Sequence, residues 1–147
     1  MGLFAAIDIA ASGLTAQRVR LDTISNNLAN AETTRTEAGG PYRRQVPVFA
    51  ARQNETTRFV IPRPAFARAD EAAPLSAGWG VRVVAVLPDP SPPRLVYDPH
   101  HPDADASGYV AMPNVNPVTE MVDLISATRA YEANVTVITA AKAMAQR

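Results

Sequence analysis

The sequence predicts an α+β protein in which two long terminal α-helices pack as a coiled-coil-like pair and flank a small, proline-rich middle region containing β-strands. The first observation is the distribution of proline: the 147-residue chain has 13 prolines, and twelve of them lie between Pro41 and Pro113. Because proline interrupts helices, the ends are compatible with long helices and the middle is not. The second observation is that apolar residues recur at three- and four-residue spacing in both ends, which is typical of paired helices.

Residues 1–31 are predicted to form the first helical arm. One stripe of this arm is apolar at every position but one; it comprises Leu3, Ile7, Ala10, Leu14, Gln17, Leu21, Ile24, Leu28 and Ala31. Gly13 lowers the stability of the helix by about 1 kcal/mol relative to alanine, so the isolated arm is expected to be marginal. A helix over this stripe would be about 43 Å long, whereas a compact chain of this size is about 38 Å across. Part of the stripe is therefore expected to face other molecules.

Residues 32–115 are predicted to form a middle region of short strands and turns. The predicted strands are Tyr42–Phe49, in which Pro47 indicates an edge or a bulge, and Val81–Leu87, Arg94–Tyr97 and Tyr109–Met112. A proline- and arginine-bearing stretch at about 53–76 is predicted to be a variable surface loop. Seven arginines in residues 35–68 and four aspartates in residues 89–105 are expected to lie in solvated loops, contact between the two segments within or between subunits being the alternative.

Residues 116–147 are predicted to form the second arm. Asn116 is a typical N-cap, Pro117 suits the first helical position, and Glu120 lies in the turn where an acid favours the helix dipole. A second three-four stripe follows, consisting of Met121, Leu124, Thr128, Tyr131, Val135 and Ile138 and widened by Val118, Val122 and Ile125. We expect the two arms to form one axial core domain, although two core helices of an ordinary small α+β domain would show the same periodicity.

The composition argues against several classes of function. Fourteen basic residues balance fourteen acidic ones, so no overall field favours nucleic acid or an anionic membrane. The chain has no cysteine, which excludes disulfides, thiolate metal sites and a cysteine nucleophile. No cleaved signal peptide is expected, because the start of the chain lacks a basic segment and carries Asp8 where a signal would be apolar. No apolar run approaches the length of a membrane span.

The segment His100-His101-Pro102-Asp103 contains metal-ligand residue types. We interpret it as a proline-braced turn, because adjacent histidines in an extended chain point to opposite sides, the prolines limit convergence, and no nucleophile motif or third ligand pair accompanies them. We therefore expect no catalytic residue, no metal and no cofactor, and we predict that the protein is not an enzyme. The arginines are not organised on a helix with stacking aromatics, so nucleic-acid binding is also not expected.

Four segments resemble a known family. The stretch 21–33, LDTISNNLANAET, is similar to the amino-terminal signature of flagellar rod and hook proteins, and the stretches EMVDLI (120–125) and RAYEAN (129–134) resemble their carboxyl-terminal helix. The block from Asp89 to Pro117 resembles the proximal-rod members in particular. The resemblance implies a structural subunit of the flagellar rod that transmits torque as part of the drive shaft. It also implies type III export, a place in the periplasmic basal body, and contacts with other rod subunits and with copies of itself.

The two arms supply the candidate subunit-interface residues, which are Ile7, Leu14, Leu21, Ile24, Asn26, Asn27, Leu28, Asn30, Met121, Leu124, Ile125, Tyr131, Asn134, Val135 and Ile138. Asparagines buried between helices fix register, but Asn27 and Asn30 also suit the end of a helix, and both roles stay open. The alternative function is a membrane-surface or secretion-apparatus component that uses its amphipathic arms. The scarcity of lysine on the polar faces argues against membrane binding.

Overall fold

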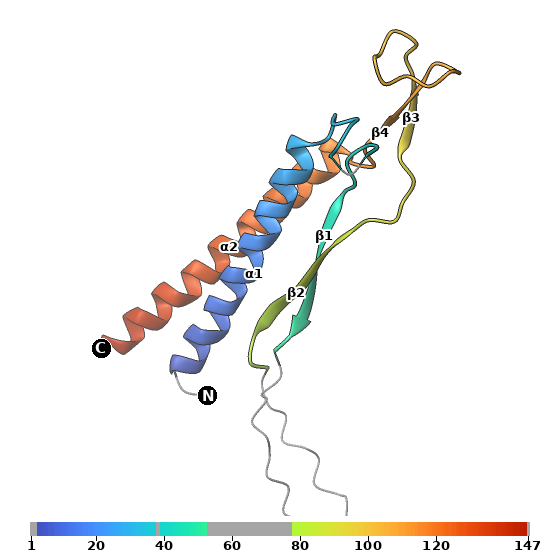
Figure 1. Ribbon diagram of the computed structural model, residues 1–147. Coiled ribbons are helices and arrows are strands. Elements are labelled where there is room, and N and C mark those ends of the chain that lie inside the picture. The colour runs from blue at the N-terminus through green and yellow to red at the C-terminus, as the bar shows by residue number, and fades with distance from the viewer. Residues whose placement is uncertain (1–2, 38, 53–77, 147) are drawn as a thin grey trace, which may run out of the picture.

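Two long helices lie side by side and antiparallel, so that both termini are at the same end of the molecule (Figure 1). The computed structural model describes residues 3–37, 39–52 and 78–146. Helix α1 spans Leu3–Ala29 and helix α2 spans Pro117–Ala145. Between them the described residues form four short strands. The predicted α+β fold with paired terminal helices is confirmed.

The helix ends follow from local side-chain chemistry. The Asn116 side-chain oxygen accepts a hydrogen bond from the Val118 amide at 3.0 Å, and Pro117 is the first helical residue, as the sequence predicts. At the end of α1 the Asn26 carbonyl accepts both the Asn30 backbone amide at 3.1 Å and the Asn30 side-chain amide at 2.9 Å, so Asn30 closes the last turn twice. Asn30 therefore has the helix-ending role that the sequence left open.

The two helices approach closely because small and polar residues line their contact. A Cβ atom added to Gly13 would lie 2.9 Å from the side-chain oxygen of Asn134, so glycine permits the approach of α2 at this point. Two heptads further along the pair, Asn27 donates to Glu120 across the same contact at 3.2 Å. Gly13, expected from the sequence only to weaken α1, thus also has a packing role.

The buried face of α2 lies one position away from the predicted apolar stripe. Its fully buried residues are Glu120, Ala127 and Ala141, which repeat at heptad spacing with the half-buried Asn134. Leu124, Tyr131 and Ile138 lie at the edge of this face and are half-buried. The remaining members of the stripe are exposed, namely Met121, Thr128 and Val135. At this contact α1 presents the backbone of Gly13 and the side-chain amide of Asn27, and small or polar residues of α2 pack against them.

A β-hairpin packs on α1. Strand β1 (Gln45–Ala51) pairs antiparallel with β2 (Val81–Pro88), and a register shift after Val48 leaves Val84 as the extra residue of a bulge. The Val81 amide donates to the Ser12 hydroxyl at 3.1 Å, which fixes the start of β2 against α1. Among the described elements α1 contacts both this hairpin and α2, whereas α2 contacts no strand. Helix α1 is therefore the shared support of the subunit.

Strand β1 begins three residues later than the predicted Tyr42–Phe49. Tyr42 belongs to the loop before the strand instead, because its amide donates to the Thr33 carbonyl at 3.0 Å and its hydroxyl donates to Asn27 of α1. Pro47 lies in a two-stranded sheet opposite Val86, where both strands are edges, as its presence predicts.

Strands β3 (Arg94–Tyr97) and β4 (Tyr109–Met112) have the predicted bounds and form a second antiparallel hairpin that projects past the helix pair (Figure 1). The rings of Tyr97 and Tyr109 meet edge to face with centroids 5.3 Å apart. In the part of the chain that the structure describes, these two strands contact no other helix or strand. The loop predicted at 53–76 lies outside the described residues.

The hydrophobic core is made mainly of small side chains. Its buried apolar members in the described ranges are Ala10, Ala16, Ile24, Ala31, Val110, Val115, Ala127 and Ala141. Alanine buries far less apolar area than leucine or isoleucine, so this core contributes little hydrophobic free energy for two helices of this length. Among the helical residues described, no stretch is both long and apolar enough to cross a membrane.

Candidate functional site

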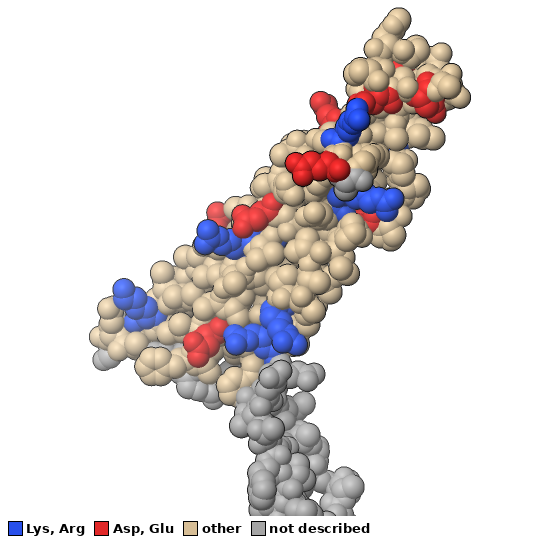
Figure 2. Space-filling view, in the orientation of Figure 1, with Lys and Arg blue, Asp and Glu red and all other residues tan. Residues whose placement is uncertain are grey.

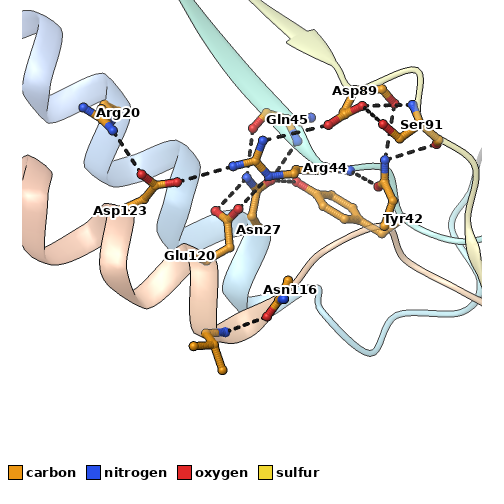
Figure 3. A network of polar contacts seen from close by, with 12 residues as sticks. Arg20, Asn27, Tyr42, Arg44, Gln45, Asp89, Ser91, Asn116, Glu120 and Asp123 are labelled. Carbon is orange, nitrogen blue, oxygen red and sulfur yellow. Dashed lines mark hydrogen bonds and ion pairs between the residues drawn. The ribbon is translucent and has the colours of Figure 1, made fainter.

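A buried carboxylate on α2 links this helix to α1 and to the residue before β1. Glu120, in the first turn of α2, is only 1% exposed. One of its oxygens accepts a hydrogen bond from the Arg44 Nε at 2.6 Å, and the other accepts a hydrogen bond from the Asn27 side chain at 3.2 Å (Figure 3). A buried charge is tolerated only when it is paired and hydrogen-bonded. Glu120 therefore requires the residue before β1 and the last turns of α1 to be in place.

The Asn27 side chain forms two hydrogen bonds with the backbone of Gln45, the first residue of β1. Its side-chain amide donates to the Gln45 carbonyl at 2.8 Å, and its side-chain oxygen accepts from the Gln45 amide at 2.9 Å. The same oxygen accepts from the Tyr42 hydroxyl at 3.0 Å. With the bond to Glu120, one asparagine thus connects α1 to both β1 and α2, and this explains why it is 1% exposed.

Partly exposed ion pairs surround this centre. Arg44 lies 3.6 Å from Asp123 and 3.9 Å from Asp89, and Asp123 also pairs with Arg20 of α1 at 3.3 Å. Because the side chains of Arg20, Arg44 and Asp123 are about a quarter to a third exposed, each of the two ion pairs with Asp123 contributes less than about 1 kcal/mol. Arg44 and Asp89 are the one ion pair between the arginine-bearing and aspartate-bearing segments among the described residues.

The surroundings of the network shift the pKa values of Tyr42 and Asp89. Burial, and secondly the negative charge of Glu120, raises the pKa of Tyr42, so its hydroxyl keeps the proton that it donates to Asn27. Hydrogen bonds from the Ser91 hydroxyl and amide lower the pKa of Asp89, with a smaller contribution from Arg44. Asp89 is therefore a stable anion beside Arg44, and the network acts as a set of fixed contacts between elements.

The histidine segment is a turn, as predicted. The His100 amide donates to Asp98 at 3.1 Å, and the His101 Nδ1 accepts from the Asp103 amide at 3.1 Å, so one ring nitrogen of His101 is already used. Within the described residues no group of three or more histidine, aspartate or glutamate side chains is placed to hold a metal ion.

The structure divides the candidate interface residues into three groups. Ile24 and Asn27 are buried by the chain itself. Nine are half-buried along the helix pair, namely Ile7, Leu14, Leu21, Leu28, Asn30, Leu124, Tyr131, Asn134 and Ile138. Four are exposed, namely Asn26, Met121, Ile125 and Val135. Their role in contacts between subunits stays a prediction.

An open apolar face lies at the start of α2, on the side turned away from α1. We call it the α2 face; it consists of Val118, Met121, Val122 and Ile125, which are 65, 45, 62 and 55% exposed. Their spacing of three, four and seven residues places them on one side of the helix, opposite the buried Glu120 and Ala127. Four adjacent exposed apolar side chains on a helix are typical of a docking surface.

The sequence reasoning missed the polar network. It placed Glu120 in the first turn for its effect on the helix dipole, and it did not single out Tyr42 or Arg44 as individual residues. The available signal was weak: Glu120 precedes Ala127 by one heptad and is therefore a charged residue at a position that faces the partner helix. The pairing with Arg44 spans 76 residues, and no local pattern indicates such a contact.

Comparisons with known proteins agree on one family. The family described as "Flagella basal body rod protein" matches residues 7–35, and the C-terminal region of flagellar basal body rod FlgEFG proteins matches residues 106–147. The flagellar basal-body rod protein FlgC of Borreliella burgdorferi is 52% identical over 98% of this chain and 93% of its own length. FlgC of Bacillus subtilis is 45% identical over 98% of this chain and 94% of its own length, and FlgC of Aquifex aeolicus is 40% identical over 100% and 95%. The chain therefore belongs to the FlgC family of flagellar basal-body rod proteins.

Proposed function

We propose that this chain is a non-catalytic subunit of the periplasmic flagellar rod, that it reaches the rod by type III export without a cleaved signal, and that it helps to transmit torque. As a member of the FlgC family it is a structural protein of the flagellar basal body. Its partners in this proposal are copies of itself and other rod subunits, which it contacts through residues 1–31 and 116–147. These two segments act together as the axial core domain.

The single observation that carries the proposal is the exposed α2 face. An apolar patch made of Val118, Met121, Val122 and Ile125 is unfavourable in water, and burying it against a neighbour recovers the free energy of apolar transfer. The opposite side of α2 is already used by α1, so the helix has one face for its own chain and one for another. A subunit built in this way is suited to repeated helix packing in a tube.

The shape and the polar network support a role in torque transmission. The helices contain 27 and 29 residues, so they are about 40 and 44 Å long. Asn27 and Glu120 connect both helices to the β1–β2 hairpin, and a subunit connected in this way moves as one body. A rotating shaft needs subunits that pass on force without internal slippage.

The proposal is tested by placing a charge in the α2 face. Val122→Asp would bury an unpaired carboxylate between subunits, which costs several kcal/mol, so we expect loss of motility and loss of the subunit from purified basal bodies. Ser126→Asp is the matched control, because Ser126 is exposed on the same helix but belongs to neither the α2 face nor the buried contact with α1. Export is measured separately from the secreted protein. Normal incorporation of the Val122→Asp variant would refute the use of this face.

A further inference from the structure

We propose that the β3–β4 arm of one subunit docks on the termini-bearing end of a second copy of this chain. The β3–β4 arm is defined as residues 94–112. The termini-bearing end is defined by the described residues at that end, which are residues 4–13, 50–52, 78–82 and 134–146. The proposal deepens the proposed function, because it names the partner and a second contact surface for self-assembly.

The arm has an apolar face that the chain does not cover. Leu95 pairs with Ala111 and Tyr97 pairs with Tyr109, so these side chains share one face of the two-stranded ladder. Leu95, Tyr97 and Tyr109 are 66, 64 and 44% exposed. Tyrosine is enriched at protein interfaces, where its ring is buried and its hydroxyl finds a partner.

The arm has few contacts with the rest of the subunit, one of them being the hydrogen bond that the Thr34 hydroxyl donates to Asp103 at 2.8 Å. Its other face carries Val110, which is 2% exposed, but neither strand contacts another helix or strand among the described elements. A single two-stranded hairpin is marginally stable in water. The projection of the arm past the helix pair makes its apolar face available to a neighbour (Figure 1). We infer that docking stabilises the arm.

The charge of the arm indicates that its partner is a second copy of this chain. The arm contains three aspartates, Asp98, Asp103 and Asp105, and one arginine, Arg94, which gives a formal net charge of −2. The whole chain is neutral, so this negative charge is balanced elsewhere. Figure 2 shows acidic residues gathered near the tip formed by the arm and basic residues prominent at the opposite end. Complementary potentials of this kind steer two surfaces into register.

The termini-bearing end has the complementary composition. Its charged residues in the defined ranges are Arg52, Arg82 and Lys142 against Asp8, which gives a formal net charge of +2. It also exposes large apolar side chains, which are Phe4, Trp79, Val137 and Met144 at 81, 50, 48 and 65%. The bond from Val81 to Ser12 places the start of β2 beside the amino-terminal part of α1, so the charges and apolar groups share one end.

Two unlike surfaces at opposite ends of one chain give a head-to-tail contact. Each copy then offers an arm to one neighbour and a termini-bearing end to another, and such heterologous contacts extend from copy to copy. This arrangement suits a filamentous structure, whereas a self-complementary patch would produce closed dimers. The contact uses no residue of the α2 face, so the two surfaces are tested independently.

Disulfide cross-linking tests the contact directly, because the natural chain contains no cysteine. We expect the Leu95→Cys/Met144→Cys variant to give a ladder of dimers and trimers when basal bodies are oxidised and separated without reductant. The two positions lie at opposite ends of the molecule, so the bond must form between copies. Leu95→Cys/Ser126→Cys is the matched control, since Ser126 is exposed on α2 outside the termini-bearing end, and we expect no ladder from it.

Charge exchange provides the second measurement. Asp103→Lys or Lys142→Glu alone should lower the yield of the cysteine-pair cross-link at least about tenfold, which corresponds to about 1.4 kcal/mol, and the two changes together should restore it. If the cysteine pair itself reduces incorporation, Asp103→Lys and Lys142→Glu are instead compared by motility in the chain without cysteines. Restored motility in the variant that carries both changes supports docking. Absence of both ladder and rescue overturns the docking. A photo-reactive residue at position 95 that captures another protein in place of this chain also overturns it. Normal incorporation in either case leaves the proposed function standing.

Discussion

Removing Arg44 should leave a buried carboxylate without its charged partner. In the native subunit Glu120 is 1% exposed and its Oε1 lies 2.6 Å from the Arg44 Nε. Breaking a buried pair by removing one member costs about 3 to 5 kcal/mol. Because the Arg44 side chain is 25% exposed, water reaches the site, and we expect the lower value. Arg44→Met should therefore lower the free energy of unfolding by about 3 kcal/mol, a change of about 150-fold in the folding equilibrium.

The double variant distinguishes a buried pair from lost packing. Arg44→Met/Glu120→Met removes both charges and keeps apolar volume, so it should regain most of the stability lost in Arg44→Met. Urea unfolding followed by far-UV circular dichroism measures all variants, with TMAO added to populate the folded helices without new contacts. Arg43→Met, at an exposed neighbouring position, is the control and should change stability by less than about 0.5 kcal/mol. The reasoning is refuted if Arg44→Met behaves like Arg43→Met, or if the double variant is as unstable as the sum of both single changes.

The other predictions concern the arms and the histidine turn. In a verified monomer, amides of both terminal helices should exchange hydrogen rapidly, because the alanine-rich core supports them weakly; strong protection throughout would contradict this. Leu21→Asp and Ile138→Asp should abolish motility and rod incorporation while the subunit is still exported, and normal assembly of both variants would show that these half-buried positions are not covered in the rod. Calorimetric titration with zinc should detect no micromolar binding that is lost in the His100→Ala/His101→Ala variant; a stoichiometric site lost in it would restore a metal-site interpretation.

Local chemistry explains why much of the fold was predictable. Asn116 and Pro117 mark the start of α2 through a cap and a fixed φ angle, and both signals depend only on neighbouring residues. The strands Arg94–Tyr97 and Tyr109–Met112 have the predicted bounds because prolines and glycines flank alternating or apolar runs. Strand β1 was predicted too early because the position of Tyr42 depends on its hydrogen bond to Asn27 of α1, which is 15 residues away.

The phase of the helix contact could not be read from apolar spacing alone. Apolar periodicity favoured Met121 and Val135 as seam residues, but α2 meets α1 through Glu120, Ala127 and Asn134. The close approach at Gly13 and the polar centre decide that phase, and both are properties of two segments far apart in the chain. The same reason leaves a wider apolar surface exposed on α2 than the paired-helix prediction implied.

A high-resolution cryo-electron microscopy map of intact basal bodies that contain this chain would show whether the α2 face is buried between subunits. We expect Val118, Val122 and Ile125 to lie against a neighbouring subunit and to lose most of the exposure that they have in the single chain. The expected map also shows Glu120 still paired with Arg44 inside each subunit. A rod in which these α2 residues face solvent, with subunits joined through other surfaces, would contradict the account.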